Sequence, residues 1–135
     1  MIVDTSALIA IAYREPHAGA MLQALATQAS LRISAANMLE AWMVVDRKSD
    51  PSAKVILDEM LDRFGITVES ITEEHVVVAR DAWRRYGRGS GHPAQLNFGD
   101  CFAYALAKVT AEPLLYVGND FTHTDLLLAT VGDTR

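Results

Sequence analysis

Hydrophobic residues recur along the chain in two rhythms, as short β-rich runs and as longer stretches with helical spacing. The short runs predict strands over residues 2–4, 31–34, 66–71 and 114–117, and a short fifth strand over residues 129–131. The longer stretches predict helices over residues 6–13, 17–28, 35–48, 51–64, 73–86 and 98–110. Strands that alternate with helices predict an α/β protein, in which helices cover both faces of a parallel sheet.

Local signals mark where several of these helices begin and end. Asp50 followed by Pro51 is typical of a helix start, because aspartate caps free amides and proline fits the first helical position. Gly65 then ends the same helix. Neither a linker nor a repeat interrupts the pattern, so we expect one domain over residues 1–135.

The composition fits a soluble globular protein, with 50% hydrophobic and 21% charged residues. The single cysteine, Cys101, cannot form an internal disulfide, which favours a reducing cytoplasm. We expect neither a signal peptide nor a membrane span, because the apolar runs are too short. A formal net charge of −5 argues against coating nucleic acid through many lysines and arginines, although a local metal site could still grip phosphates.

Four acidic residues stand where a parallel sheet places functional sites, beyond the carboxyl ends of strands. Asp4 ends the first predicted strand, and Asp120 follows the fourth. Glu40 lies inside an almost wholly apolar helix, where a charge is costly to bury unless it is paired or bound to metal. Asp100 falls in the first turn of the helix over residues 98–110, where the helix dipole favours an ionised carboxylate.

Each acid also has an ordinary structural explanation. Asp4 can cap the helix that follows it, and Asp120 can belong to an Asn-Asp turn. The spacing of Asn97 and Asp100 resembles a capping box, and Glu40 can reach solvent at a helix edge. The functional inference therefore comes from the set, since gathered carboxylates repel one another and a divalent cation removes that repulsion.

The ligand chemistry of the set indicates which ion it would bind and what reaction would follow. The histidines show no metal-ligand spacing; they are His17, His75, His92 and His123. Ligands that are all oxygen favour Mg²⁺ or Mn²⁺ over zinc. An ion held by carboxylates can orient a phosphodiester and activate a water, which predicts phosphodiester hydrolysis.

Around these acids the sequence resembles the PIN-domain nucleases, specifically the VapC-type toxins of prokaryotic toxin–antitoxin pairs. The matching segments, in chain order, are Met-Ile-Val-Asp-Thr-Ser-Ala-Leu, Ser-Ala-Ala-Asn-Met-Leu-Glu, Leu-Asn-Phe-Gly-Asp-Cys-Phe-Ala-Tyr-Ala-Leu-Ala and Leu-Leu-Tyr-Val-Gly-Asn-Asp-Phe. The resemblance implies a three-layer α/β/α sandwich on a parallel sheet of four to five strands, a homodimer, and RNA cleavage that depends on Mg²⁺ or Mn²⁺. It also implies a cognate antitoxin that inserts a peptide into the acidic groove.

Carried over by motif, the resemblance implies an acidic triad of Asp4, Glu40 and Asp100, with Asp4 and Asp100 as direct metal ligands. Many relatives carry an extra acid just before the position that matches Asp120, where this chain has Asn119. Asp120 is therefore the expected fourth catalytic acid, acting directly or through a water. As a mechanistic hypothesis, Asp4 and Asp100 hold the ion while Glu40 positions or deprotonates the attacking water.

Residues outside the acidic set leave two explanations open. Three basic residues lie at the end of the helix over residues 73–86 or in the glycine-rich loop over residues 87–93, namely Arg84, Arg85 and Arg88. They could bind the RNA backbone or an acidic segment of the antitoxin. Alternatively, they only complement the dipole of the helix. Large side chains at helical spacing are expected in the core or in a dimer interface, namely Trp42, Met43 and Trp83.

Rival functions differ in what they require of the residues. A non-catalytic binding module on the same fold remains the alternative, although a pure binding groove has no need of clustered acids. A phosphorylation-dependent receiver domain requires an aspartate after the third strand, where this chain has Glu69-Ser70-Ile71-Thr72. A serine hydrolase that uses Ser6 is not favoured, because no Gly-x-Ser-x-Gly motif surrounds it.

Overall fold

The computed structural model describes residues 1–131, which fold into a parallel sheet flanked by helices. The strands are β1 (Ile2–Val3), β2 (Arg32–Ser34), β3 (Thr67–Glu69) and β4 (Leu114–Leu115). The helices are α1 (Thr5–Ala12), α2 (Ala18–Ala26), α3 (Ala35–Arg47), α4 (Pro51–Phe64), α5 (Glu73–Tyr86) and α6 (Phe98–Thr110). The strand order is β3-β2-β1-β4 and every pairing is parallel, so the predicted α/β class is confirmed.

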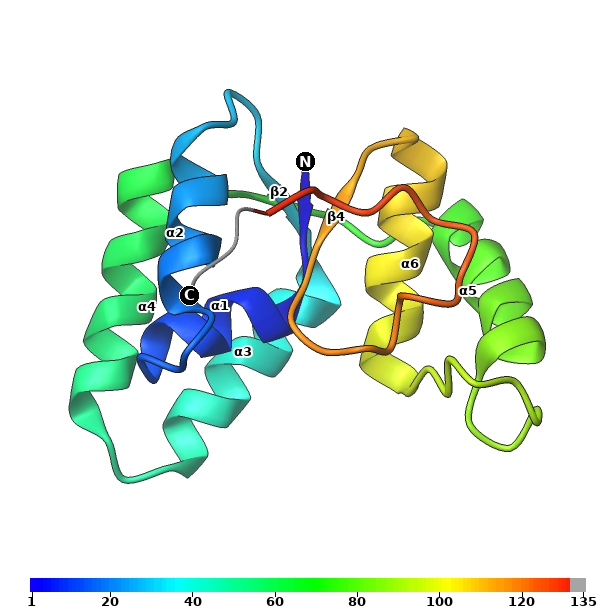
Figure 1. The fold of residues 1–135 in the computed structure, drawn as a ribbon, viewed down its shortest axis with the longest axis horizontal. Helices are drawn as coiled ribbons and strands as arrows, with labels where there is room; N and C mark the ends of the chain where they lie inside the picture. Colours follow the sequence, from blue (N-terminus) through cyan, green and yellow to red (C-terminus); the bar gives the residue numbers. More distant parts are fainter. Residues whose placement is uncertain (132–135) are drawn as a thin grey trace.

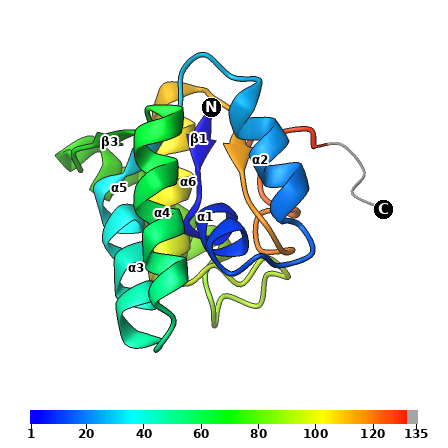
Figure 2. The ribbon, with the colours of Figure 1, turned by 90° about the vertical axis from the view of Figure 1, so that its left-hand side faces the viewer.

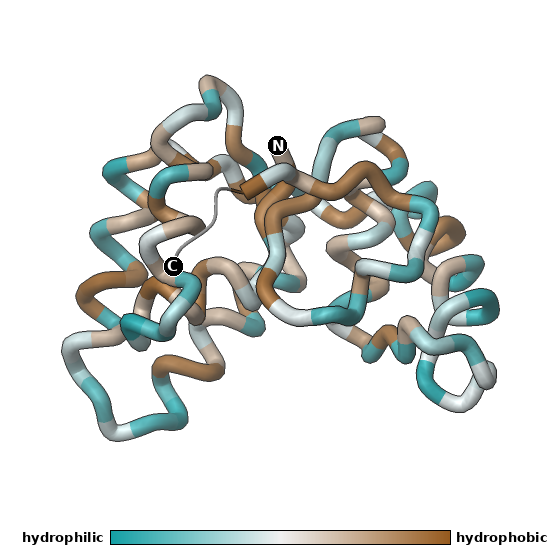
Figure 3. Tube along the Cα trace, viewed as in Figure 1, coloured by the Kyte–Doolittle hydropathy of each residue, from teal (hydrophilic) through white to brown (hydrophobic). Residues whose placement is uncertain are grey.

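The sheet is the middle of three layers (Figures 1 and 2). Helices α1 to α4 cover one face, and α5 and α6 cover the other. Successive strand residues point to opposite faces, so Val3 and Leu115 join the first core while Ile2 and Leu114 join the second. Hydrophobic segments accordingly gather along the central strands, whereas the loop of residues 87–93 is largely hydrophilic (Figure 3). The predicted three-layer sandwich is confirmed.

Helix ends follow the local signals in the sequence. Asp50 caps α4 by accepting hydrogen bonds from the amides of Ser52 (3.0 Å) and Ala53 (3.4 Å). Gly65 ends that helix in the left-handed conformation (φ 60°), which glycine adopts without steric cost. Within residues 1–131, no helix combines the length and the apolar character needed to cross a bilayer.

The predicted fifth strand over residues 129–131 is wrong. The segment touches the sheet at a single parallel bridge between Leu114 and Leu128, with hydrogen bonds of 3.0 Å from Leu114 to Leu127 and 2.9 Å from Ala129 to Leu114. β4 is only two residues long (Leu114–Leu115), so its edge is too short for a longer ladder of hydrogen bonds to the passing chain.

A polar cluster ties the segment after β4 to α6. The fully buried Tyr104 hydroxyl donates to Asp125 over 2.6 Å, and the ammonium group of Lys108 lies 2.9 Å from the same carboxylate. Burial would raise the pKa of Asp125, but these two hydrogen bonds, with the charges of Lys108 and Arg85, lower it to about 2. The segment that carries Asp120 is therefore anchored a few residues further on.

We expect Tyr104→Phe to lower the free energy of unfolding by about 1–2 kcal/mol, because it removes a buried hydrogen bond to a charged group. Urea denaturation at neutral pH measures the loss. Tyr116→Phe is the matched control, since among residues 1–131 its hydroxyl pairs only with Thr122, at an exposed position. Equal losses in the two variants would contradict a structural role for the Tyr104–Asp125 bond.

Candidate active site

Asp4 lies at the carboxyl end of β1 and caps α1. Its Oδ2 atom accepts hydrogen bonds from the amide (3.0 Å) and the hydroxyl (2.6 Å) of Ser6, and its side chain is almost fully buried. The Ser6 hydroxyl in turn accepts from the amide of Val117 (2.9 Å), which joins the chain after β4 to the start of α1. Capping therefore uses one carboxylate oxygen of Asp4 and leaves Oδ1 for a ligand.

Asp100 completes the capping box of α6. Its Oδ2 atom accepts from the Asn97 amide (3.0 Å), while its own amide donates to Asn97 Oδ1 (2.8 Å). The side chain is only 8% exposed. As at Asp4, the structural role occupies a single carboxylate oxygen, so the capping and functional explanations are compatible.

Glu40 approaches the site from α3 and is half-buried. Its carboxylate lies directly against the α-carbon of Gly99, where an added β-carbon would stand 2.5 Å from Glu40 Oε2. Asn37 lies one turn earlier on α3. Its side-chain Nδ2 donates to the Gly99 main-chain carbonyl over 2.9 Å, and its main-chain carbonyl accepts from the Thr5 hydroxyl, also over 2.9 Å. The contacts of Asn37 and Gly99 thus join α1, α3 and the start of α6.

The acids influence one another electrostatically. Burial is the main cause that raises the pKa of Asp4 to about 6; the Ser6 hydrogen bonds oppose it, and the charges of Glu40 and Asp120 add to it. Burial is also the main cause that raises the pKa of Asp100 to about 7. The hydrogen bond from the Asn97 amide lowers this pKa, and the charges of the other three acids raise it further. The negative charges of Glu40 and Asp120 therefore lie close enough to Asp4 and Asp100 to disfavour the ionisation of these two aspartates.

Asp120 differs from the other three acids because it is exposed, in the turn that follows β4. The structure therefore places Asp120 at the edge of the acidic site, within electrostatic range of Asp4 and Asp100.

The donor set suits a hard cation, although it is not a preformed cage. Within residues 1–131, no three acidic, histidine or cysteine side chains converge closely enough to enclose a metal ion. The candidate ligands are carboxylates with free oxygens, and an added positive charge would offset both causes that raise the pKa values of Asp4 and Asp100, burial first and the neighbouring negative charges second.

The structure narrows the predictions for two sets of neighbouring residues. Trp42 and Met43 on α3 and Trp83 on α5 lie outside the core, because they are 41%, 58% and 46% exposed, so of the two predicted positions only the dimer interface remains. Arg85 forms ion pairs with Asp81 (3.3 Å) and Asp125 (3.5 Å), whereas the sequence left RNA or antitoxin binding and complementation of the helix dipole open for it.

Comparison with known proteins gives the family of this fold and site. The sequence pattern of the PIN domain matches residues 1–127. The chain is 52% identical to Ribonuclease VapC28 of Mycobacterium tuberculosis over 124 residues, which cover 92% of this chain and 93% of the relative. It is 48% identical to Ribonuclease VapC42 of the same species over 126 residues, or 93% and 96% of the two chains. The chain belongs to the PIN-domain family, within its VapC branch.

Solved structures show the same fold at low sequence identity. The crystal structure of VapBC2 from Rickettsia felis, bound to a DNA fragment from its promoter, aligns with a TM-score of 0.75 at 14% identity, over 97% of this chain and 98% of that one. The structure of M. tuberculosis VapC20, described as a Sarcin-Ricin loop cleaving toxin, aligns with a TM-score of 0.73 at 18% identity, over 95% and 97%. Both likenesses extend over almost the whole PIN fold.

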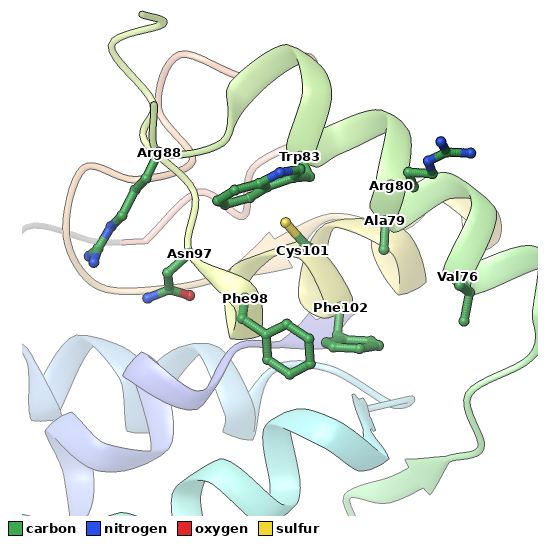
Figure 4. A pocket seen from close by; sticks show the side chains of 9 residues that line it. All are labelled: Val76, Ala79, Arg80, Trp83, Arg88, Asn97, Phe98, Cys101 and Phe102. Atoms are coloured by element: carbon green, nitrogen blue, oxygen red, sulfur yellow. The ribbon is translucent and has the colours of Figure 1, made fainter. Parts of the chain in front are cut away.

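An apolar cavity lies beside the acidic site of this PIN domain, between α5 and α6 (Figure 4). It has a volume of about 530 Å³, and Asn97 and Phe98 at the start of α6 form part of its wall. The Trp83 ring lies over Cys101, and the Arg88 side chain runs toward Asn97 (Figure 4). The first turn of α6, which carries Asp100, therefore contributes to the wall of the cavity.

Proposed function

We propose that this chain is a metal-dependent endoribonuclease that acts as the toxin of a toxin–antitoxin pair. The observation that carries the proposal is the pair of buried aspartates, Asp4 and Asp100, each with one oxygen used for capping and a pKa raised to about 6 or 7. The VapC relatives named ribonucleases, at 48–52% identity, support RNA as the substrate.

Asp4 and Asp100 are the proposed ligands of Mg²⁺ or Mn²⁺, because both are buried and keep a carboxylate oxygen uncommitted. When bound, such an ion supplies orientation of the phosphodiester and activation of a water. The protein contributes the rigidity of the ligands, since Ser6 fixes one carboxylate and Asn97 the other.

Glu40 is the proposed general base, which orients the attacking water and accepts its proton. It comes from a different helix than the two ligands and its carboxylate lies against the first turn of α6, next to Asp100. Asp120, at the exposed edge, is proposed to complete the site directly or through a water. Hydrolysis then forms a bond between the water oxygen and phosphorus and breaks one P–O bond of RNA; the proton of the water passes to Glu40, and the displaced oxygen takes a proton from solvent.

Incubation of total cellular RNA with the purified protein and Mg²⁺ or Mn²⁺ tests this function. We expect discrete cleavage that stops when a chelator is added and returns when excess metal is restored. A protein that bound metal and left every RNA intact would instead be the non-catalytic binding module on the same fold.

Arg88 is the best placed cation to hold the RNA backbone. Its side chain runs toward Asn97 (Figure 4), and within residues 1–131 it forms no ion pair, unlike Arg85. We expect Arg88→Ala to weaken RNA binding about 3–10-fold. The slope of the logarithm of the binding constant against the logarithm of the salt concentration should fall by roughly one, as for the loss of one phosphate contact. Fluorescence anisotropy with the Asp100→Asn protein measures binding without cleavage. Arg63→Ala, at an exposed arginine of α4 on the opposite face of the sheet, is the control, and equal affinities in both variants would contradict the role.

A cognate antitoxin is the proposed partner. The structural neighbours include the Rickettsia felis VapBC2 assembly and a toxin–antitoxin complex from Klebsiella pneumoniae, which matches with a TM-score of 0.62 at 20% identity. The gathered carboxylates favour a segment that presents a basic side chain to them. We therefore expect the antitoxin to compete with metal and RNA for the acidic groove.

We also propose that the protein is a homodimer. Large hydrophobic side chains are exposed on α3, α5 and α6, where a monomer would leave them in water; they are Leu39, Trp42, Met43, Val76, Trp83 and Phe98. The cytoplasm remains the proposed location, on the single free cysteine.

Three of these exposed residues, Val76, Trp83 and Phe98, line the apolar cavity, so the proposed dimer would cover it. A charge placed in the cavity should therefore separate the two protomers. Val76 lines the cavity between α5 and α6, whereas its neighbour Val77 is 64% exposed and does not. We expect Val76→Glu to shift the protein from dimer to monomer in analytical ultracentrifugation, while Val77→Glu stays dimeric. A monomeric parent, or the same shift in both variants, would remove this face from the interface.

A further inference from the structure

The contact between Glu40 and Gly99 is unusually close. A β-carbon at position 99 would lie 2.5 Å from Oε2, 2.8 Å from Oε1 and 2.9 Å from Cδ of Glu40. These distances are shorter than van der Waals contact, so any side chain at this position would have to displace the Glu40 carboxylate. The space that Glu40 occupies exists because residue 99 has no side chain.

The backbone gives no reason for glycine at this position. Gly99 is a helical residue of α6 and does not adopt a positive φ, unlike Gly65 and Gly118. Alanine is the better helix former by about 1 kcal/mol in helix interiors, so glycine here does nothing for helix formation. The reason for glycine lies in what faces it, namely Glu40.

The junction around Gly99 is fixed, so it cannot yield in place of Glu40. Asn37 is fully buried, and its side-chain Nδ2 donates to the Gly99 main-chain carbonyl over 2.9 Å. The main-chain carbonyl of Asn37 accepts from the Thr5 hydroxyl. Withdrawing the start of α6 from α3 would break that buried hydrogen bond. A side chain at position 99 would therefore move the carboxylate, the far end of a flexible side chain, and not the backbone.

We propose that Gly99 is a positioning residue: it keeps open the space that holds the Glu40 carboxylate beside Asp100. The proposal rests on the function proposed above, in which Glu40 orients and deprotonates the attacking water. Misplacement of a catalytic group by about 1 Å can cost about 100-fold in rate. Gly99→Ala should therefore lower kcat strongly, with a smaller effect on KM, since the proposed role of Glu40 is to act on the attacking water and not to bind RNA.

A double-mutant cycle with Glu40→Asp tests the contact, because aspartate withdraws the carboxylate by one methylene. We expect Gly99→Ala to lower kcat about 100-fold, and Glu40→Asp to lower it in the parent but to restore part of the loss in the Gly99→Ala protein. Gly19→Ala is the matched control, a glycine-to-alanine change in α2 with nothing within 4 Å of the new β-carbon. The proposal would be overturned if Gly99→Ala had the same kcat as Gly19→Ala. It would also be overturned if Glu40→Asp lowered kcat by the same factor in the parent and in the Gly99→Ala protein.

The same cycle in metal-free thermal unfolding separates this inference from the proposed function. We expect Glu40→Asp to raise the Tm of the Gly99→Ala protein, by relieving the clash, and to leave the Tm of the parent unchanged or lower. If the parent cleaves no RNA, the proposed function fails while these unfolding data still decide whether position 99 controls Glu40. Independent effects of the two substitutions on Tm would overturn the contact itself.

Discussion

Asp100→Asn is expected to lower the rate of RNA cleavage by about 1,000-fold or more while the protein stays folded. Asparagine has the shape of aspartate, and its oxygen can still accept from the Asn97 amide, so the capping box of α6 survives. What the variant loses is one negative charge at the proposed metal site. A 1,000-fold loss corresponds to about 4 kcal/mol of transition-state stabilisation.

Single-turnover cleavage at saturating Mg²⁺ or Mn²⁺ measures this loss, and circular dichroism reports the fold. Asp50→Asn is a close control, because Asp50 caps α4 through the same kind of amide contacts and has no place in the acidic site. We expect the Asp50→Asn protein to cleave like the parent. Comparable rates for Asp100→Asn and Asp50→Asn would show that Asp100 serves only as a cap.

Asp4→Asn is expected to make the metal-free protein more stable at pH 8, by up to about 3 kcal/mol. The pKa of Asp4 is raised to about 6, mainly by burial, so the folded state binds a proton more readily than the unfolded chain, with its pKa near 4. The carboxylate therefore costs nothing below pH 4, costs progressively more as the pH rises, and reaches its full cost above pH 6. Asparagine avoids this cost and can still cap α1.

Urea denaturation with a chelator, at several values between pH 5 and pH 8, measures the difference between Asp4→Asn and the parent. The advantage of the variant should grow with pH. Adding Mg²⁺ or Mn²⁺ should stabilise the parent and not the variant, because only the parent keeps both ligands. A variant less stable than the parent at pH 8 would mean that the hydrogen bonds from Ser6 outweigh the burial of the charge.

The sequence was sufficient to predict the features that depend on local signals. Asp50, Pro51 and Gly65 mark both ends of α4, and the predicted limits of α5 and α6 agree with the structure. The positions of Asp4 and Asp120 beyond strand ends follow from the parallel sheet, since its strands all end at one edge.

Features that depend on contacts between distant segments could not be predicted. Trp42 and Met43 were predicted in the core or in a dimer interface, and the sequence could not decide between the two, because periodicity does not tell which face of α3 a neighbouring element covers. The ion pair between Arg85 and Asp125 could not be predicted, because the two residues lie 40 positions apart in the sequence.

The contact between Glu40 and Gly99 shows the same limit within the site. Glu40 could be selected from its apolar surroundings, but its position depends on a missing side chain on another helix. Asn37, a polar residue in the same apolar segment, was the one available signal of that junction.

The most direct test of the central claim is the rate of RNA cleavage as a function of Mn²⁺ concentration, measured together with calorimetric occupancy of the metal site. We expect cleavage to rise in proportion to occupancy in the parent, and both to be lost in Asp4→Asn and Asp100→Asn. Cleavage that persists in a chelator, or in the absence of bound Mn²⁺ in either variant, would contradict a metal-dependent ribonuclease built on these two aspartates.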